Sequence, residues 1–325
     1  MPTATIEADA LTKRYGNTEA LAGVSFTVEQ GSVLGVLGPN GAGKTTAVRI
    51  LTTLARPDGG RATVAGHDVV TDAAAVRRHI GVAAQDATLD GLLSGRQNLV
   101  LVGELSGMGR RTSRRRAAEL LEEFELDHAA DRVVKGYSGG MRRRLDLAAS
   151  LMTSPPVLFL DEPTTGLDPA SRLRVWESVR QLIRSGVTLL LTTQYLEEAD
   201  ALADRIVVID HGRVIADGTP QQLKEQTRGA RLEVTLTSAS PAAAGAMALL
   251  ASGRVEISAD GRRLSAPVDD TSGLASEVVR SLDRAGVRVD DIAVRRPSLD
   301  DVFFSLTGDH LGDDESSPEL DEVTR

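Results

Sequence analysis

The sequence GPNGAGKT, from Gly38 to Thr45, decides the fold of this chain. It matches the pattern G-x-x-x-x-G-K-[ST], and it joins an apolar segment of strand length, VLGVLG, to a helix-like segment, KTTAVRILTTLAR. In such a loop the backbone N–H groups close around a phosphate, and the dipole of the following helix adds positive potential. The sequence therefore predicts a phosphate-binding loop between a buried strand and a helix.

Two side chains carry the chemistry of this loop. Lys44 is predicted to bring a positive charge to the β- and γ-phosphates of a nucleotide, and Thr45 to offer its hydroxyl to Mg²⁺. A glycine-rich turn without a ligand is the alternative, and the strand and helix on either side argue against it. The residues predicted to bind the nucleotide in this region are Gly38, Pro39, Asn40, Gly41, Ala42, Gly43, Lys44, Thr45 and Thr46.

A second apolar segment, VLFLDEP, ends in Asp161 and Glu162. Its four apolar residues predict a central strand, so both carboxylates lie at its carboxyl end, where open α/β sheets bind their ligands. Asp161 is predicted to hold Mg²⁺, directly or through water. Glu162 is predicted to act as the general base that polarises the attacking water. Two exposed acids at the start of a loop are the alternative, which the phosphate-binding loop makes less attractive.

Further apolar segments of strand length alternate with helix-like segments. PPVLFLDE precedes PASRLRVWESVRQLIRSG, and VTLLLTTQ precedes YLEEADALAD. This alternation predicts a covered, mostly parallel sheet of the α/β class. The segment DRIVVIDHGRVIADG contains DHG, a turn predicted to join two edge strands. The residues before Val33 read as short strands with turns, which predicts an antiparallel β subdomain.

The strand signal is absent between Leu89 and Lys135. RQNLVLVGELSGM and RRRAAELLEEFEL have apolar residues near helical spacing, so a helical insert is expected over about residues 89–150. The segment RRTSRRR is interpreted as a solvated helix start, and a nucleic-acid patch is the alternative. From Thr227 the pattern restarts as β-α-β-β-α-β, the split βαβ arrangement, which predicts a small α+β accessory domain over residues 228–307.

Composition limits the classes of function. The net charge is −9, and residues 309–325 contribute −6 of it from seven acids and one arginine, so this tail is predicted to be disordered. The rest of the chain is not basic, so no nucleic-acid partner is expected. Without cysteine there is no disulfide or thiolate metal site, which fits a reducing cytosol. No apolar run approaches the ~18 residues of a membrane span, and no signal-peptide core is apparent.

A further anion site is suggested by YSGGM, in which Ser138, Gly139 and Gly140 stand at the head of a helix-like run. Ser138 as a plain helix N-cap is the alternative. A capping box would place Glu or Gln at position 141, where this chain has Met141. Each glycine lowers helix propensity by about 1 kcal/mol, so close approach of an anion or tertiary packing is expected to compensate.

Together these motifs resemble the nucleotide-binding domain of an ATP-binding cassette (ABC) transporter, a P-loop NTPase fold, over about residues 5–225. The phosphate loop, YSGGM and LFLDEPTTGLDP occur in the family's order and at similar spacing. The resemblance implies an ATPase in which two copies pack head to tail around two Mg-ATP molecules. Each copy's signature, Ser138 to Gly140, would then cap the γ-phosphate held by its partner.

The resemblance also implies roles for single residues. Tyr15 lies where the family stacks an aromatic ring on adenine, and a half-buried strand residue is the alternative. Gln85 resembles the glutamine that senses Mg²⁺ and water and leads into the helical insert. Asp168 resembles the residue that communicates across the dimer, and it also fits a helix N-cap before Pro169. Gln194 stands where the family usually has a histidine that contacts the γ-phosphate; it can donate a hydrogen bond but cannot become cationic.

The segments LTTQYLEEADALADRIVVIDHGRVIADGTP and SLDDVFFSLTG are similar to those of daunorubicin/doxorubicin resistance ATPases. This similarity implies a homodimer at the cytoplasmic face of the cell membrane that drives a separate multi-helix permease exporting a drug or antibiotic-like compound. Lipid or polysaccharide export is an alternative. A soluble ABC ATPase acting on DNA or ribosomes is another, although the long coiled coils, zinc modules or second cassette of such proteins are missing. Lys44, Asp161 and Glu162 are all present, unlike in a non-catalytic cassette.

Overall fold

The computed structural model divides the chain into two compact units, Met1–Pro220 and Gln221–Arg325, and each is described by itself. The limits expected from the sequence, 5–225 and 228–307, stay predictions, and the acidic tail lies outside the described residues. The structure describes residues 4–83, 89–226, 230–268, 274–295, 298–300 and 302–303. In these ranges no helix combines the length and the apolar composition that crossing a membrane requires.

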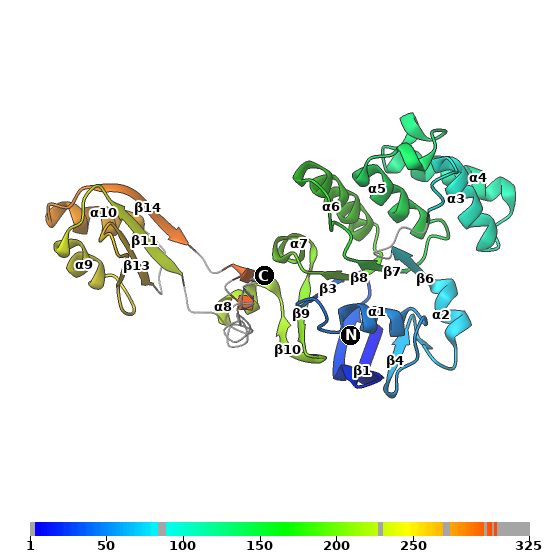
Figure 1. The fold of residues 1–325 in the computed structure, drawn as a ribbon, viewed down its shortest axis with the longest axis horizontal. Helices are drawn as coiled ribbons and strands as arrows, with labels where there is room; N and C mark the ends of the chain where they lie inside the picture. Colours follow the sequence, from blue (N-terminus) through cyan, green and yellow to red (C-terminus); the bar gives the residue numbers. More distant parts are fainter. Residues whose placement is uncertain are drawn as a thin grey trace, which may run out of the picture. The chain divides into compact units, whose positions relative to one another are not determined.

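A six-stranded sheet forms the centre of the first unit, in the order β10-β9-β3-β8-β7-β6 (Figure 1). Strands β9, β3, β8, β7 and β6 are parallel, and β10 pairs with β9 in the antiparallel sense. The hairpin turn at DHG is therefore present, but β9 lies one strand inside the edge, contrary to the expectation of two edge strands. The strands are β3 Val33–Leu37, β6 Ile80–Ala83, β7 Val157–Asp161, β8 Thr188–Thr193, β9 Arg205–Asp210 and β10 Arg213–Gly218.

An antiparallel sheet of the order β2-β1-β4-β5 forms the second layer. Strands β1 (Ala4–Tyr15) and β2 (Thr18–Glu29) have 12 residues each, so the short strands expected from the sequence are in fact two long ones. Strand β4 (Gly59–Val64) pairs with β1, and β5 (His67–Asp68) pairs with β4. The predicted fold class, a mostly parallel core with an antiparallel β subdomain, is confirmed.

The central sheet is apolar on both faces, because β3, β7 and β8 are buried along their whole length. Val157 and Phe159 of β7 face a cluster that includes α1 (Lys44–Leu51) and the antiparallel sheet. Leu158 and Leu160 face the opposite cluster, which the helices complete. Those helices are α3 Gly95–Leu105, α4 Arg110–Glu123, α5 Gly139–Ser150 and α6 Pro169–Arg184. Continuous apolar strands are what a sheet covered on both faces requires.

The predicted helical insert consists of α3, α4 and α5, with short 3-10 turns between α4 and α5. Ser94 and Gln97 form a capping box that fixes the N-terminus of α3. The segment RRTSRRR forms the first turns of α4, where Arg115 and Arg116 lie near Glu119 on the exposed side. The interpretation as a solvated helix start therefore holds. Helices α2 (Ala73–His79) and α7 (Leu196–Leu202) complete the unit.

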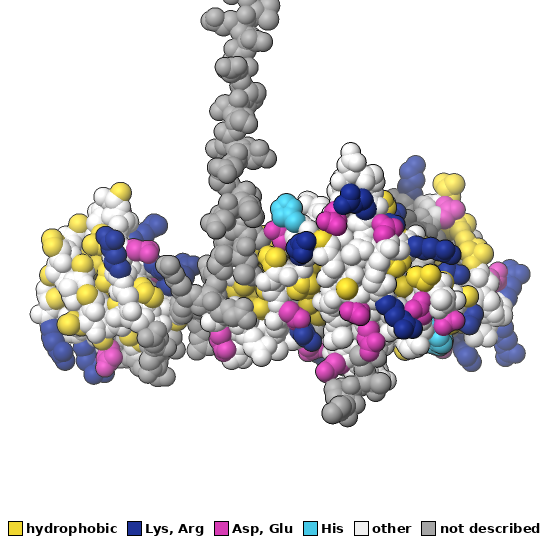
Figure 2. Space-filling view, turned by 90° about the horizontal axis from the view of Figure 1, so that it is seen from below, with side chains coloured by type: hydrophobic (Ala, Val, Ile, Leu, Met, Phe, Trp, Pro, Cys, Tyr) yellow, Lys and Arg dark blue, Asp and Glu magenta, His cyan; other side chains and the backbone are white. Residues whose placement is uncertain are grey.

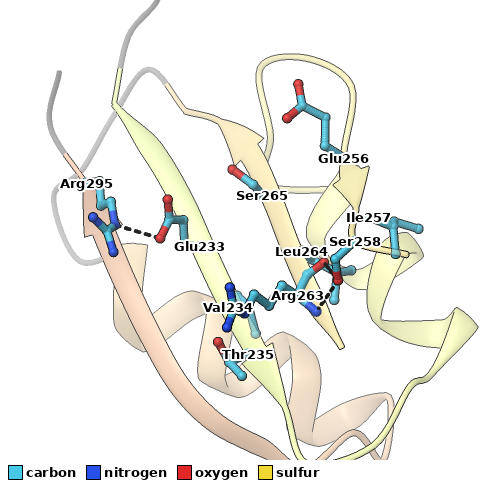
Figure 3. A pocket seen from close by; sticks show the side chains of 10 residues that line it. All are labelled: Glu233, Val234, Thr235, Glu256, Ile257, Ser258, Arg263, Leu264, Ser265 and Arg295. Atoms are coloured by element: carbon cyan, nitrogen blue, oxygen red, sulfur yellow. Dashed lines mark hydrogen bonds and ion pairs between the residues drawn. The ribbon is translucent and has the colours of Figure 1, made fainter. Parts of the chain in front are cut away.

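Helix α8 (Pro220–Gln226) starts at the last residue of the first unit. The second unit contains a sheet of the order β12-β13-β11-β14 with all neighbours antiparallel. Leu232, Val234 and Leu236 of β11 pack with the two helices on one face. On the other face a hollow of about 530 Å³ is bordered by the ion pair between Glu233 and Arg295, as Figure 3 shows. The elements are β11 Arg231–Leu236, α9 Pro241–Ala248, β12 Glu256–Ile257, β13 Arg263–Pro267, α10 Leu274–Arg284 and β14 Val289–Arg295.

Candidate functional site

The loop from Gly38 to Lys44 is held in a form that only glycine allows. Gly43 has φ +111°, and a Cβ there would lie 2.4 Å from the carbonyl oxygen of Ala20. Gly38 is equally confined, since a Cβ added to it would lie 2.1 Å from the carbonyl oxygen of Ile209. Helix α1 follows at once, and no side chain caps its start at Gly43. A helix N-terminus without a side-chain cap suits an anion.

Lys44 is almost fully buried, with 5% of its surface exposed. Its Nζ donates to the carbonyl oxygens of Gly38 and Pro39, at 2.8 and 3.0 Å, and lies 4.0 Å from Oε1 of Glu162. Burial lowers the pKa of Lys44, while the charges of Glu162 and Asp161 act in the opposite direction. An anion brought close to this ammonium group would therefore relieve the cost of burying it.

A pocket of about 560 Å³ lies over the loop, within the range of small-ligand sites. It brings together residues predicted from three separate sequence segments: the loop, Glu162 after β7, and Gln194 after β8. Asp161 does not line it; this buried carboxylate accepts a hydrogen bond from the Thr192 hydroxyl. The lining residues are Ala20, Asn40, Gly41, Gly43, Lys44, Thr45, Thr46, Glu162, Thr165 and Gln194.

Glu162 has an unusual backbone conformation for a residue with a side chain. Its φ is +48°, in the left-handed region, which costs on the order of 1–3 kcal/mol and persists only where neighbours fix it. Its N–H donates to the carbonyl oxygen of Thr192 at 3.0 Å, and its Oε2 accepts from the Thr165 hydroxyl at 3.2 Å. Sequence reasoning missed Thr165 and Thr192, although both belong to threonine pairs beside the predicted residues.

The oxygen donors near the loop fit a magnesium ion. Thr45 exposes its side chain to the pocket, and Asp161 stands at the end of β7. Mg²⁺ with a nucleotide needs only one or two protein ligands, because phosphates and waters complete its shell. The absence of any cluster of three or more His, Cys, Asp or Glu in the described residues is compatible with such a site. Gln85, also predicted to sense Mg²⁺, lies outside the described residues.

A buried polar network supports the loop that follows Glu162. Oε1 of Glu198 on α7 accepts from the hydroxyl of Thr164 at 2.8 Å and from the indole N–H of Trp176 at 2.9 Å. Burial raises the pKa of Glu198, against the effect of these hydrogen bonds. The network ties the loop to α6 and to α7, the helix that follows Gln194.

The signature residues are explained in part by packing. Ser138 caps α5, since its hydroxyl accepts from the N–H of Met141 at 3.2 Å, and the N-cap alternative is confirmed. A Cβ on Gly140 would lie 2.7 Å from the Ser171 hydroxyl, so packing against α6 requires this glycine. Gly139 has only an ordinary contact, 3.5 Å to Leu167. The predicted anion role of these residues stays a prediction.

Two further predicted residues lie apart from the pocket lining. Asp168 caps α6, accepting from the N–H and hydroxyl of Ser171 at 2.9 and 2.6 Å, and these bonds lower its pKa. Its helix-cap role is confirmed, and its role across a dimer stays a prediction. Tyr15, the last residue of β1, is 47% exposed with Lys13 near its ring, which agrees with the alternative of a half-buried strand residue. Its stacking on adenine stays a prediction.

The chain matches two protein-family profiles, "ABC transporter" over residues 21–165 and "ATP-binding protein DrrA1-3-like, C-terminal domain" over residues 218–307. It is 58% identical over 304 residues to daunorubicin resistance ATP-binding protein DrrA3 of Streptomyces coeruleorubidus, covering 94% of this chain and 96% of the relative. The chain belongs to the ABC transporter ATP-binding proteins. Within that family it is of the daunorubicin/doxorubicin resistance type, as the resemblance implied.

Other members of the ABC family agree. Daunorubicin/doxorubicin resistance ATP-binding protein DrrA of Streptomyces peucetius is 50% identical over 323 residues, 99% of this chain and 97% of that one. A Nod factor export ATP-binding protein of Burkholderia lata is 40% identical over 314 residues, 96% and 100% of the two chains.

Solved structures agree as well. An ATP-binding subunit of an ABC transporter has a TM-score of 0.62 and 28% identity, covering 69% of this chain and 93% of its own. A dimeric ATP-binding cassette in a post-hydrolysis state with ADP and phosphate has a TM-score of 0.60 and 26% identity, covering 66% and 98%. The chain is therefore the nucleotide-binding, ATP-hydrolysing subunit of an ABC exporter.

Replacing Gly140 by alanine should destabilise the first unit by about 1–3 kcal/mol, because the new methyl group overlaps Ser171. The measurement is urea unfolding followed by emission of Trp176, the only tryptophan of the chain. Gly139→Ala is the matched control: its methyl group meets only an ordinary contact and alanine favours the helix, so its midpoint should equal or exceed that of the wild type. A Gly140→Ala midpoint as high as that of Gly139→Ala would show that packing does not require Gly140.

Proposed function

We propose that this chain binds Mg-ATP in the 560 Å³ pocket and powers the export of a drug or antibiotic-like compound through a separate membrane permease. The meeting of Lys44, Glu162 and Gln194 in one pocket carries the proposal. The names of the relatives at 50–58% identity support the class of compound. Export of a lipid or polysaccharide is the second candidate, since a 40% identical relative is named for Nod factor export.

In this proposal the residues in and near the pocket divide the work of hydrolysis. The loop N–H groups and Lys44 hold the β- and γ-phosphates, and Thr45 and Asp161 hold the ion. Mg²⁺, when bound, neutralises charge on the phosphate oxygens. Glu162 accepts the proton of the attacking water, and Thr165 orients its carboxylate. Gln194 donates a hydrogen bond to the γ-phosphate as a neutral group, and Tyr15 stacks on the adenine.

Two copies complete one another in this proposal. The pocket lining contains none of the signature residues, so Ser138, Gly139 and Gly140 serve the nucleotide of the partner subunit. Asp168 lies between the two sites and reports the state of one to the other. The similarity to a cassette solved as a dimer with ADP and phosphate supports this arrangement. ATP binding closes the head-to-tail homodimer, and hydrolysis reopens it, as a population shift.

The permease connects this cycle to transport. We place the chain at the cytoplasmic face of the membrane, held there by the permease, with the helical insert and the Gln85 segment transmitting closure. On the face that Figure 2 shows, basic and acidic side chains are interspersed over the first unit, which speaks against the alternative of a nucleic-acid substrate. No nucleic-acid partner is therefore proposed.

Cells that express this chain with its permease should exclude daunorubicin, and cells with Glu162→Gln should accumulate it like cells without the chain. The general base contributes about 10²–10⁴-fold to the rate, so its loss removes the energy source while nucleotide binding remains. Drug uptake by fluorescence and ATP turnover of the purified complex are the measurements. Normal turnover in the variant would reject the role of Glu162. Turnover without drug exclusion, together with export of a labelled lipid-linked oligosaccharide, would favour the second candidate.

Mixing two inactive variants should restore ATP hydrolysis if the pockets are shared between subunits. Lys44→Ala removes the positive charge of the phosphate-binding loop, and Ser138→Arg places a large side chain where the signature would contact the partner's nucleotide. A mixed dimer has one complete pocket, so an equal mixture should reach up to about a quarter of the wild-type rate. Steady-state phosphate release measures this. A mixture no more active than its components would contradict the head-to-tail homodimer, and each variant alone is the control.

Replacing Gln194 by histidine should make hydrolysis newly dependent on pH. Glutamine is neutral at every pH, whereas histidine gains a proton near pH 6.5 and then attracts the anionic γ-phosphate more strongly. The ratio of the variant rate to the wild-type rate should therefore rise as the pH falls through about 6.5. Gln194→Asn is the neutral control, whose ratio should stay flat. A flat ratio for Gln194→His would place this side chain away from the γ-phosphate.

A further inference from the structure

Arg143 of α5 connects the signature helix to the catalytic strand end through its whole guanidinium group. Its Nε donates to the carbonyl oxygen of Pro163 at 2.7 Å, and its Nη2 donates to the carbonyl oxygen of Asp161 at 3.0 Å. Its Nη1 donates to Oδ2 of Asp146 at 3.3 Å. The side chain is 11% exposed, so these bonds are shielded from water. Sequence reasoning assigned no role to this arginine.

The two carbonyl groups that Arg143 binds flank Glu162. This residue has the left-handed φ of +48°, a conformation that persists only where the surroundings fix it. One constraint comes from β8, because the N–H of Glu162 donates to the carbonyl oxygen of Thr192 at 3.0 Å. The other comes from α5, because Arg143 holds the peptide carbonyls on both sides. Arg143 and β8 therefore both hold the backbone next to Glu162.

An arginine is the side chain that suits this position. Its planar group holds several donors in a fixed fork and stays protonated inside proteins, whereas lysine is a flexible point charge. Burial lowers the pKa of Arg143. The negative charge of Asp146 acts in the opposite direction, and the charges of Glu198 and Asp161 do so more weakly. The buried charge is thus compensated by neighbouring carboxylates, as a buried cation requires.

We propose that Arg143 is a positioning residue for Glu162 and that it couples the two half-sites of one subunit. Helix α5 begins at Gly139, capped by Ser138, so a shift of the helix against the partner's nucleotide moves Arg143 and with it the peptides around Glu162. Gly139 and Glu162 also line one hollow of about 360 Å³, together with Arg143. Arg143 thereby links the signature residues, which contact the partner's nucleotide, to Glu162 in the pocket of the same subunit. This inference rests on the proposed role of Glu162.

The test is Arg143→Lys in the full chain, reconstituted with the permease. Lysine keeps the charge beside Asp146 but cannot hold both carbonyl groups, so kcat should fall on the order of 10- to 100-fold. Arg143 does not line the nucleotide pocket, so the KM for ATP should change less than about threefold. Arg144→Lys is the matched control: it replaces another buried arginine of α5, whose Nη1 bonds the carbonyl oxygen of Phe124 at 2.7 Å. Its kcat should stay within about twofold of wild type.

A double-mutant cycle separates positioning from general loosening of the fold. If Arg143 acts through Glu162, then Arg143→Lys should lower the single-turnover rate of the Glu162→Gln protein less than about twofold. Equal losses in both backgrounds, or equal losses for Arg143→Lys and Arg144→Lys, would overturn the inference while leaving the role of Glu162 intact. A Glu162→Gln protein as active as wild type would instead reject the proposed role of Glu162, and this inference with it.

A milder variant covers the case in which Arg143→Lys does not fold, as judged by the emission of Trp176. Asp146→Asn keeps the arginine and the volume of its partner but removes the charge that orients the guanidinium group. It should lower kcat several-fold in the wild-type background and have little effect in the Glu162→Gln protein. An unchanged kcat, or the same loss in both backgrounds, would overturn the inference.

Discussion

The structure depends on the parallel pairing of three buried strands, β3, β8 and β7. Leu37 pairs with Thr193 and Asp161 pairs with Thr192, so the carboxyl ends of β3 and β7 are brought level by the strand between them. This register places Nζ of Lys44 within 4.0 Å of Glu162, although the two residues are far apart in the sequence. A slip in the register of these strands would separate Lys44 from Glu162, because each of these residues follows the carboxyl end of its strand.

Much of the site was predictable because its chemistry is local in the sequence. The loop motif names Lys44, and the rule that ligands bind at the carboxyl ends of parallel strands names Glu162. Tertiary contacts escaped prediction, because a side chain's partner is not written beside it. Arg143 reads as one of three arginines in a row, and the reason for Gly140 is visible only when Ser171 lies against it. Likewise β4 escaped notice, since its pairing with β1 spans some fifty residues of sequence.

Two buried ionisable side chains of the first unit, Glu198 and Arg143, contact the same short loop after β7. Glu198 binds the loop after Glu162 and the indole of Trp176, while Arg143 binds the carbonyl oxygens of Asp161 and Pro163. Buried polar groups of this kind are costly when unpaired and rigidifying when paired. Around this loop, hydrogen bonds take the place of apolar packing. They come from Arg143 of α5 and from Glu198 of α7, which also binds Trp176 of α6.

The left-handed backbone of Glu162 has a consequence for how this protein can change. Glycine is the residue that adopts such a φ without steric cost, so conformational energy alone would favour glycine at this position. A glycine has no carboxylate, however, so the substitution that relaxes the backbone most would remove the general base that we propose. With the role proposed for Glu162, this position would be one at which activity requires a residue that lowers stability locally.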